Sequence, residues 1–280
     1  MKEANVPTIS IANSANWYNK LLVTIGPQNN PSDAKFAIAI STNAFGTTQY
    51  VKSDFTVGNT LALSDYQTYA GWNSASGTFV RGLLPSTVYT VKSKAFRGEY
   101  SESPYGPTAA VSTVDPQLSF DIDVSAIDVS TNPPYVISFG NLLVSTITDS
   151  STKVWVSLQT NGESGGKVYM SGQNSGLKST SANYTIGSTA GDINAQLEGF
   201  GAQGATATQA SGGPLALIAP YDGVGQNIGA TDNLIREMFS TSSPIVAGRG
   251  SFILKAKTKP LTPASSDYAE ILTVVAAASF

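Results

Sequence analysis

The chain has 280 residues, of which 41% are hydrophobic and 12% are charged, and its formal net charge is -3. This length fits two domains that each bury a core, and the apolar content excludes disorder. The small negative net charge excludes a positive electrostatic field that would attract nucleic acid or anionic membranes. Cysteine and histidine are both absent. Disulfides, thiolate metal sites, serine–histidine–acid triads and zinc hydrolase sites are therefore excluded, and we expect a protein that is not an enzyme.

The first half of the chain is predicted to consist of short strands. Residues 21–25, 36–40 and 89–95 each place apolar side chains on one face of an extended segment, as half-buried strands require. The turn-forming stretch "PQNNPSD" separates the first two of these strands. Trp17 and Trp72 lie near the predicted loops, and we expect both to pack in the core.

The stretch "GLLPSTVYTVKSKA" carries a spaced set of residues: Gly82, Leu83 or Leu84, Pro85, Thr87, Tyr89, Val91 and Ala95. With this set, residues 6–114 resemble a fibronectin type III domain at the entry to its sixth strand. The resemblance implies a β-sandwich in which the Tyr89 hydroxyl reaches back to the backbone upstream. Two positions depart from the family pattern: Ile25 stands where the family has a core tryptophan, and Ser93 replaces an apolar residue.

A domain boundary is expected near residues 115–118, because Pro116 cannot continue a central strand and a new alternating run follows it. The residues after it predict strands at "LSFDIDVSA", "YVISFG", "KVWVSLQT", "GKVYMSG", "NYTIGS", "SFILKAKT" and "YAEILTVVAAASF". The Gly- and Ala-rich residues 199–229 predict long loops with short strands. The stretch "TDNLIREMFS" has helical spacing, with Asp232 as its N-cap.

The second half also contains the blocks "ISFGNL" and "LQTNGESGGKVYMSGQNSGL" and the closing "YAEILTV". With these it resembles the β-sandwich domains of bacterial envelope proteins of the WxL and spore-coat-U type. Tyr268, Leu272 and Thr273 match the closing pattern of the WxL family, but Val274 stands at its tryptophan position, and "WVSL" at Trp155 does not meet its upstream motif. The resemblance implies a sandwich at a surface, without the cell-wall binding that the family's tryptophans support.

Two charged patterns are interpreted as solvated strand faces. Asp121 and Asp123 share one face, with Asp128 further on. Calcium prefers such oxygen ligands and is the one cofactor left open, but we expect a solvent face that blocks edge-to-edge pairing. The alternating lysines of "LKAKTKP" are likewise expected to face water.

Glycine-rich loops and an isolated tryptophan provide candidate ligand contacts. Trp155 has the opposite parity to its apolar neighbours, so its indole either points outward as an anchor for a glycan or a protein, or packs under a loop. Tyr221 and Asp222 lie among glycines that form either a sugar or ion pocket or a plain connection.

The tail "ILTVVAAASF" is apolar at both parities. A strand that is apolar on both faces is normally buried on both. We therefore expect the end of the tail to contact a neighbouring subunit or to complete a partner's sheet. The candidate ligand or subunit contacts are Trp155, Tyr221, Asp222, Tyr268 and Phe280.

These patterns predict an all-β fold of two tandem antiparallel sandwiches: a fibronectin type III-like domain at 1–115 and a WxL-like, jelly-roll or immunoglobulin-like domain at 118–280. The expected function is structural, in a secreted or bacterial cell-surface protein that self-associates or displays a binding face. The alternatives are a carbohydrate-binding adhesin module and a virion or phage-tail decoration protein. Expected partners are other copies, neighbouring surface proteins or a glycan, without nucleic acid or membrane insertion. The N-terminus "MKEANVPTIS" has no apolar core segment, so we expect a mature or trimmed chain or another route of secretion.

Overall fold

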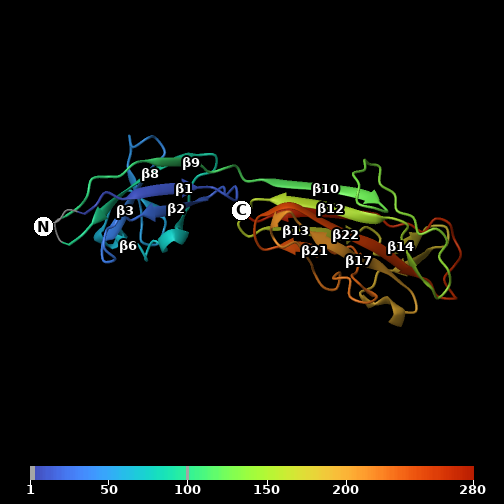
Figure 1. Cartoon of the computed structure of the whole chain (residues 1–280). Coiled ribbons are helices and arrows are strands. Elements are labelled where there is room, and N and C mark those ends of the chain that lie inside the picture. Colours follow the sequence, from blue (N-terminus) through green and yellow to red (C-terminus); the bar gives the residue numbers. More distant parts are fainter. Residues whose placement is uncertain (1–3, 99–100) are drawn as a thin grey trace. The chain divides into compact units, whose positions relative to one another are not determined.

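The chain folds into two compact units, one ending at Pro116 and one beginning at Gln117 (Figure 1). The computed structural model describes residues 4–98 and 101–280, so the first three residues of the polar N-terminus lie outside the description. The described residues form strands and three short 3-10 turns, η1 Leu63–Asp65, η2 Ser74–Ser76 and η3 Ile193–Ala195, with no α-helix. The predicted all-β fold class is thereby confirmed.

Two antiparallel sheets make up the first unit. One has the strand order β1-β2-β7 and the other has the order β5-β4-β3-β8-β9, with β6 also paired to β3. The strands are β1 Thr8–Ala12, β2 Lys20–Gly26, β3 Lys35–Ser41, β4 Gln49–Val51, β5 Val57–Gly58, β6 Gln67–Thr68, β7 Thr78–Arg81, β8 Val88–Phe96 and β9 Ala109–Ser112. The unit is a fibronectin type III-like sandwich, as the resemblance implies.

Tyr89 and Trp72 fix the core of this unit. The Leu84 amide donates a 2.8 Å hydrogen bond to the Tyr89 hydroxyl, which confirms the expected reach of this tyrosine to the upstream backbone. Trp72 is buried, and its indole N–H donates to the Phe36 carbonyl at 2.9 Å. Since Ile25 is also buried, the core tryptophan comes from the connection between β6 and β7 instead of the second strand.

Trp17 lies at the margin of this core, and Ser93 lies inside it. Trp17 is half-buried and lies edge-on to Phe79, with ring centroids 6.1 Å apart, outside the buried cluster. Its expected place in the core is therefore only partly confirmed. Ser93 is fully buried on β8, so a small hydroxyl occupies the position at which the family has an apolar side chain.

The second unit stacks two antiparallel sheets. One has the order β10-β12-β22-β11, with β17 and β18 also paired to β22, and the other has the order β19-β21-β13-β23. The pairs β14-β15 and β16-β20 complete the unit. The strands are β10 Leu118–Ser125, β11 Ile147–Asp149, β12 Lys153–Thr160, β13 Gly166–Gly172, β14 Gly176–Ser179, β15 Tyr184–Gly187, β16 Gly191–Asp192, β17 Gly199–Thr208, β18 Ser211–Gly212, β19 Ala216–Leu217, β20 Asn227–Ile228, β21 Arg236–Thr241, β22 Ile245–Lys257 and β23 Leu272–Ala278.

The predicted helix at 231–240 is wrong, because strand β21, Arg236–Thr241, covers the second half of these residues. Where β21 pairs with β13, a bulge next to Val168 inserts an extra residue. The adjacent side chains of Met238 and Phe239 are therefore both fully buried, and this gives the sequence its helix-like spacing. Asp232 caps a turn, with its carboxylate accepting the amide two residues on and pairing with the arginine that begins β21.

The long loops expected at 199–229 are wrong for the first part of this stretch, where β17 pairs along β22. Glycine is needed there because backbones and rings approach closely. A Cβ placed on Gly204 would lie 2.3 Å from the Tyr221 carbonyl oxygen, and a Cβ on Gly229 would lie 2.0 Å from the Tyr221 ring. The glycines in this region therefore serve packing around a buried tyrosine.

The lysines of "LKAKTKP" do not face water as expected. Lys255 is buried and binds Asp149 at 2.7 Å, and Lys259 binds Glu198 at 2.8 Å. Lys257 donates to the carbonyl groups of η3 and of the residue after it, at 2.7 to 3.4 Å. Lys255 thus binds the last residue of β11, whereas Lys257 and Lys259 tie η3 and the residues after it to the end of β22.

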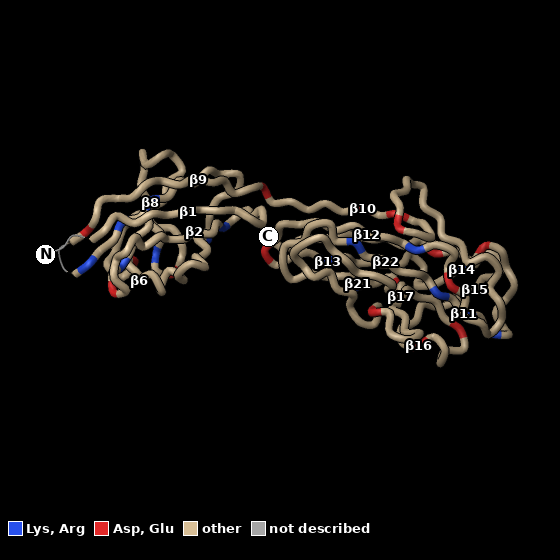
Figure 2. Tube along the Cα trace, in the orientation of Figure 1, with Lys and Arg blue, Asp and Glu red and all other residues tan. Residues whose placement is uncertain are grey.

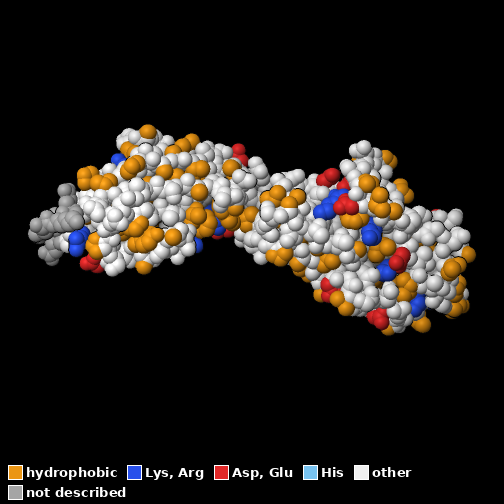
Figure 3. All heavy atoms as spheres, viewed as in Figure 1, with side chains coloured by type: hydrophobic (Ala, Val, Ile, Leu, Met, Phe, Trp, Pro, Cys, Tyr) orange, Lys and Arg blue, Asp and Glu red, His pale blue; other side chains and the backbone are white. Residues whose placement is uncertain are grey.

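Charges on the second unit occur as groups of mixed sign. Figure 2 places basic and acidic positions near each other around β10, β12 and β22, and blue and red side chains touch on the face shown in Figure 3. This face therefore lacks a stripe of one sign that would suit a polyanion. In the part of the chain that the structure describes, no helix has the length and apolarity to cross a membrane.

Candidate functional site

Trp155 is not an exposed anchor, because only 8% of its surface is accessible. It lies on the outer face of β12, as its parity predicts, but its indole N–H donates to the Ser125 carbonyl at 3.2 Å and the Arg249 guanidinium lies 5.5 Å from its ring centre. The indole is therefore covered by β22 and the end of β10.

Arg249 binds two of the three aspartates that suggested calcium. Its guanidinium binds Asp123 and Asp128, each at 2.7 Å. Asp123 is almost completely buried, so the expected solvent face is wrong at this position. Burial raises the pKa of Asp123, but hydrogen bonds from Thr131 and Arg249 outweigh it and the net pKa is lowered. Among the described residues, no cluster of three acidic side chains suits a metal ion.

Tyr221 is a core residue, with 1% of its surface exposed. Its hydroxyl donates to the Ala230 carbonyl, and burial raises the pKa of its phenol to about 12. Asp222 is exposed and accepts the Val224 amide at 3.3 Å, as a turn residue does. Tyr221 therefore packs in the core, and Asp222 stabilises a turn.

Tyr268 and Phe280 differ in their surroundings. Phe280 is about half exposed and follows the end of β23. Tyr268 is half-buried, its hydroxyl donates to the Pro263 carbonyl at 2.9 Å, and its ring lines a large cleft. Of the five residues predicted from the sequence, Tyr268 alone borders this cleft.

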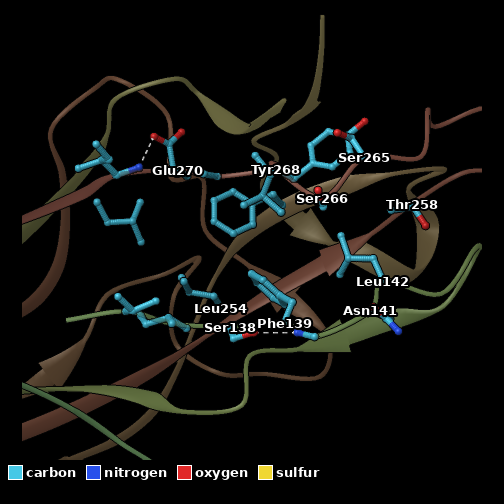
Figure 4. Close-up of a pocket in the computed structure, with 18 of the residues that line it drawn as sticks. Ser138, Phe139, Asn141, Leu142, Leu254, Thr258, Ser265, Ser266, Tyr268 and Glu270 are labelled. Carbon is cyan, nitrogen blue, oxygen red and sulfur yellow. Dashed lines mark hydrogen bonds between the residues drawn. The ribbon is translucent and has the colours of Figure 1, made fainter. Parts of the chain in front are cut away.

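The cleft has a volume of about 1100 Å³ and lies between the two sheets of the second unit. Its floor is the inner face of β10, β12 and β22, and Leu272 and Val274 of β23 lie at its side. Figure 4 shows Phe139 and Leu142 on one side of the cleft and Tyr268 and Glu270 on the other. Most of the lining is aliphatic or aromatic, as in small-molecule and peptide sites.

The two sheets are in contact near the end of β23, and the cleft lies near its start. A Cβ on Gly166, opposite Ala278 of β23, would lie 3.3 Å from the Thr160 side chain, so the sheets touch there. Toward the start of β23 the cleft lies between the sheets. The edge strands β10 and β23 thus flank an opening into the core.

A closed, empty cavity of about 1100 Å³ would cost on the order of 25 kcal/mol, at about 24 cal/mol per Å³. Domains are stable by only about 5–15 kcal/mol. The cleft must therefore be open to water or filled by another molecule.

One wall of the cleft is a segment without a partner strand, residues 135–142, called here the unpaired segment. It turns at Gly140, which has a φ of 64°, and at the bend that follows. The sequence predicts a strand at "YVISFG", but the structure assigns none because no described strand pairs with it. Within this segment, the described chain makes one backbone hydrogen bond, from the Ser151 amide to the Ser138 carbonyl at 2.8 Å. Phe139 packs edge-on against Phe200, 6.0 Å between ring centres, whereas Val136 is 81% exposed.

The opposite wall is the connection from β22 to β23, residues 259–271, called here the strap. Three carboxylates hold it: Glu198 accepts from Lys259 and Thr262, Asp267 accepts from the amides of Thr180 and Ser181, and Glu270 accepts from the amides of Gln173 and Gly176. All six distances lie between 2.7 and 3.0 Å. The strap is therefore a built wall of the cleft.

Two of the carboxylates that anchor the strap, Asp267 and Glu198, have lowered pKa values. Hydrogen bonds from the Ser179 hydroxyl, then from Ser265 and Ser181, lower the pKa of Asp267. Burial raises the pKa of Glu198, but hydrogen bonds from Lys259 and its neighbours outweigh it and the net pKa is lowered. Both carboxylates are therefore charged at neutral pH and hold the strap.

The residues that line the cleft suit the binding of a ligand. Among the described lining residues, Glu270 is the one carboxylate, and its oxygens already accept backbone amides. A glycosidase needs two facing carboxylates. The lining lysine, Lys259, is paired with Glu198. With histidine and cysteine absent from the chain, nothing at this site is arranged for acid–base or nucleophilic work.

Strand β23 lies at the edge of its sheet, so the tail is not buried on both faces as its composition suggests. The Gln173 amide donates to the Ile271 carbonyl and the Ser279 amide donates to the Gly165 carbonyl, so the odd-numbered residues point their backbone groups toward β13. The backbone groups of Leu272, Val274, Ala276 and Ala278 therefore point away, where none of the described strands pairs with β23. This side is called here the free edge.

Sequence reasoning missed the cleft because three segments far apart in the chain form it. The one local signal is the uncharged stretch "YVISFGNLLV", which predicts a strand. Its position on the cleft wall depends on distant contacts. One of them is the hydrogen bond that the Tyr135 hydroxyl donates to the Ile122 carbonyl at 2.7 Å.

Comparisons with known proteins indicate no specific function for the chain. No protein-family model and no curated protein matches the chain. Among solved structures, a two-domain fibronectin type III segment of chicken tenascin is 11% identical, with 97% of this chain and 99% of that chain covered and a TM-score of 0.29. A chaperone–tip adhesin complex of CFA/I fimbriae is 11% identical, with 98% and 84% covered and a TM-score of 0.30. Chitinase ChiA74 of Bacillus thuringiensis is 11% identical, with 98% and 29% covered and a TM-score of 0.23.

Proposed function

We propose that the chain is a non-enzymatic structural protein of a bacterial surface or extracellular assembly, and that its second unit joins another copy by strand addition at the free edge of β23. The observation that carries this proposal is the chemistry of that edge. It extends over the seven residues "LTVVAAA" without a charge or a proline, and Val275 is 45% exposed on its outer face.

Natural proteins protect edge strands with charges, prolines or bulges, since a free row of amides and carbonyls pairs with other chains. Among the described residues, β23 runs along β13 without a register shift. An edge left flat and uncharged is therefore a site for strand addition.

A second copy suits this edge because the strand carries no charge. When a strand pairs with an identical strand, like charges directly opposite each other destabilise the pair, and β23 has none to oppose. The carbohydrate-binding alternative relies on exposed aromatics, and the two aromatics named for it, Trp155 and Tyr221, are buried. A virion decoration protein would use the same kind of contact.

Sedimentation equilibrium of the purified chain tests the proposal. Val275→Lys places a charge on the edge, and we expect it to weaken self-association at least about tenfold, about 1.4 kcal/mol. Val224→Lys is the matched control, because Val224 is an equally apolar, exposed residue in the loop before β20. A monomeric wild type, or a Val275→Lys variant that associates as well as the control, would refute the proposal.

A further inference from the structure

The free edge of β23 borders the cleft at the start of the strand. Leu272 and Val274 line the cleft, whereas Ala276 and Ala278 do not. Side chains that lie opposite each other on paired strands point to the same face of the sheet. A strand added along the first half of β23 therefore places alternate side chains over the cleft.

The unpaired segment offers a second backbone to such a strand. Its amide and carbonyl groups between Tyr135 and Leu142 are largely without backbone partners in the described chain. It borders the cleft opposite the strap and the start of β23 (Figure 4). A peptide strand entering here would find backbone groups to bond on both sides, which a hydrocarbon chain could not use.

The electrostatics of the cleft restrict the occupant further. Lys259 is paired with Glu198, and Glu270 is saturated by backbone amides. No charge in the described lining is left to meet a charge on the ligand. Burying an unpaired charge in such a site is costly, so the entering segment must be uncharged.

We propose that the cleft receives alternate large apolar side chains of an extended, uncharged segment donated by the neighbouring copy. This rests on the proposed function and adds to it the chemistry of the donated segment. Main-chain pairing with β23 and the unpaired segment supplies affinity, and the cleft supplies selectivity for the side chains that enter it. The neighbouring copy meets this requirement with the strand that the proposed function already pairs, since residues 271–280, which contain β23, carry no charge.

Photo-crosslinking identifies the occupant. Placing p-benzoylphenylalanine at Phe139 puts a reactive ketone on the cleft wall in a side chain of similar shape. Irradiation of the purified, assembled protein should give a covalent dimer, and mass spectrometry should locate the link in an uncharged stretch of the second copy. A cross-link to a co-purified lipid, or an assembled sample without a dimer product, would overturn the inference.

A cavity-filling variant separates this inference from the proposed function. Val124 lines the cleft from β10 and lies away from the backbone edge of β23, so Val124→Trp should weaken association at least about tenfold. Ile235→Trp, at an exposed position outside the cleft, is the control. If Val275→Lys disrupts association and Val124→Trp does not, strand addition stands and the role of the cleft is refuted. If Val275→Lys has no effect, the proposed function itself fails.

Discussion

The two carboxylates on Arg249 provide a test of how burial sets the strength of an ion pair. The same guanidinium nitrogen binds Asp123 and Asp128, at 2.7 Å in both cases. The Asp123 side chain is 3% exposed and the Asp128 side chain is 49% exposed. The shared contact with the Arg249 nitrogen is thus matched in distance. Asp128 also accepts from Arg249 Nε at 2.9 Å, whereas Asp123 is buried and also accepts the Thr131 amide at 2.6 Å.

We expect Asp123→Ala to destabilise the second unit by about 3 kcal/mol. The charge-assisted bond to Arg249 contributes about 2 kcal/mol, and the hydrogen bond from the Thr131 amide contributes about 1 kcal/mol. Asp128→Ala should cost only about 0.5 kcal/mol, because solvent screens an exposed pair. At a urea m-value of about 2 kcal/mol/M, the midpoints fall by about 1.5 M and about 0.3 M.

Urea unfolding followed by fluorine NMR measures this difference in the whole chain. The chain has three tryptophans, and 5-fluorotryptophan gives each its own signal. Trp155, which lies opposite Asp123 in the β10–β12 pair, reports on the second unit, and Trp72 serves as the control in the first. Equal midpoint shifts for Asp123→Ala and Asp128→Ala would refute the reasoning from burial.

Three further predictions follow from the packing and the carboxylate anchors. Tyr89→Phe removes the acceptor of the Leu84 amide and should cost about 1–2 kcal/mol in the first unit, read from the Trp72 signal. Gly229→Ala places a Cβ against the Tyr221 ring and should cost about 1–3 kcal/mol, read from Trp155. Because the folded-state pKa of Glu198 is lowered, its stabilisation is present above the unfolded value near 4.5 and is lost as the pH falls through the folded value. The protection factors of the strap amides should therefore fall at a higher pH than those of β8 as the solution is acidified.

The strands were predictable where burial alternates along the chain. The stretches "KVWVSLQT" and "GKVYMSG" became β12 and β13 with the predicted bounds, because one face of each lies on the core. The corner role of Tyr89 was predictable since its partner is five residues upstream. In each of these cases the deciding contact is local, or the period of two carries the signal.

The errors share a different cause, which is contact over long sequence separation. The burial of Trp155 depends on Arg249 in β22, and the strand at Met238 depends on a bulge against β13. The cleft requires the strap to be anchored by Glu198 and Glu270. Parity and spacing along the sequence contain no information about these partners.

Amide hydrogen exchange of β23, compared between dilute and assembled samples, tests strand addition most directly. Ser279 and Ile271 fix which backbone groups already bond to β13, so the odd-numbered amides should change little on assembly. We predict that the amides of Leu272, Val274, Ala276 and Ala278 gain protection in the assembled sample. Assembly without this alternating gain of protection would contradict association through the free edge of β23.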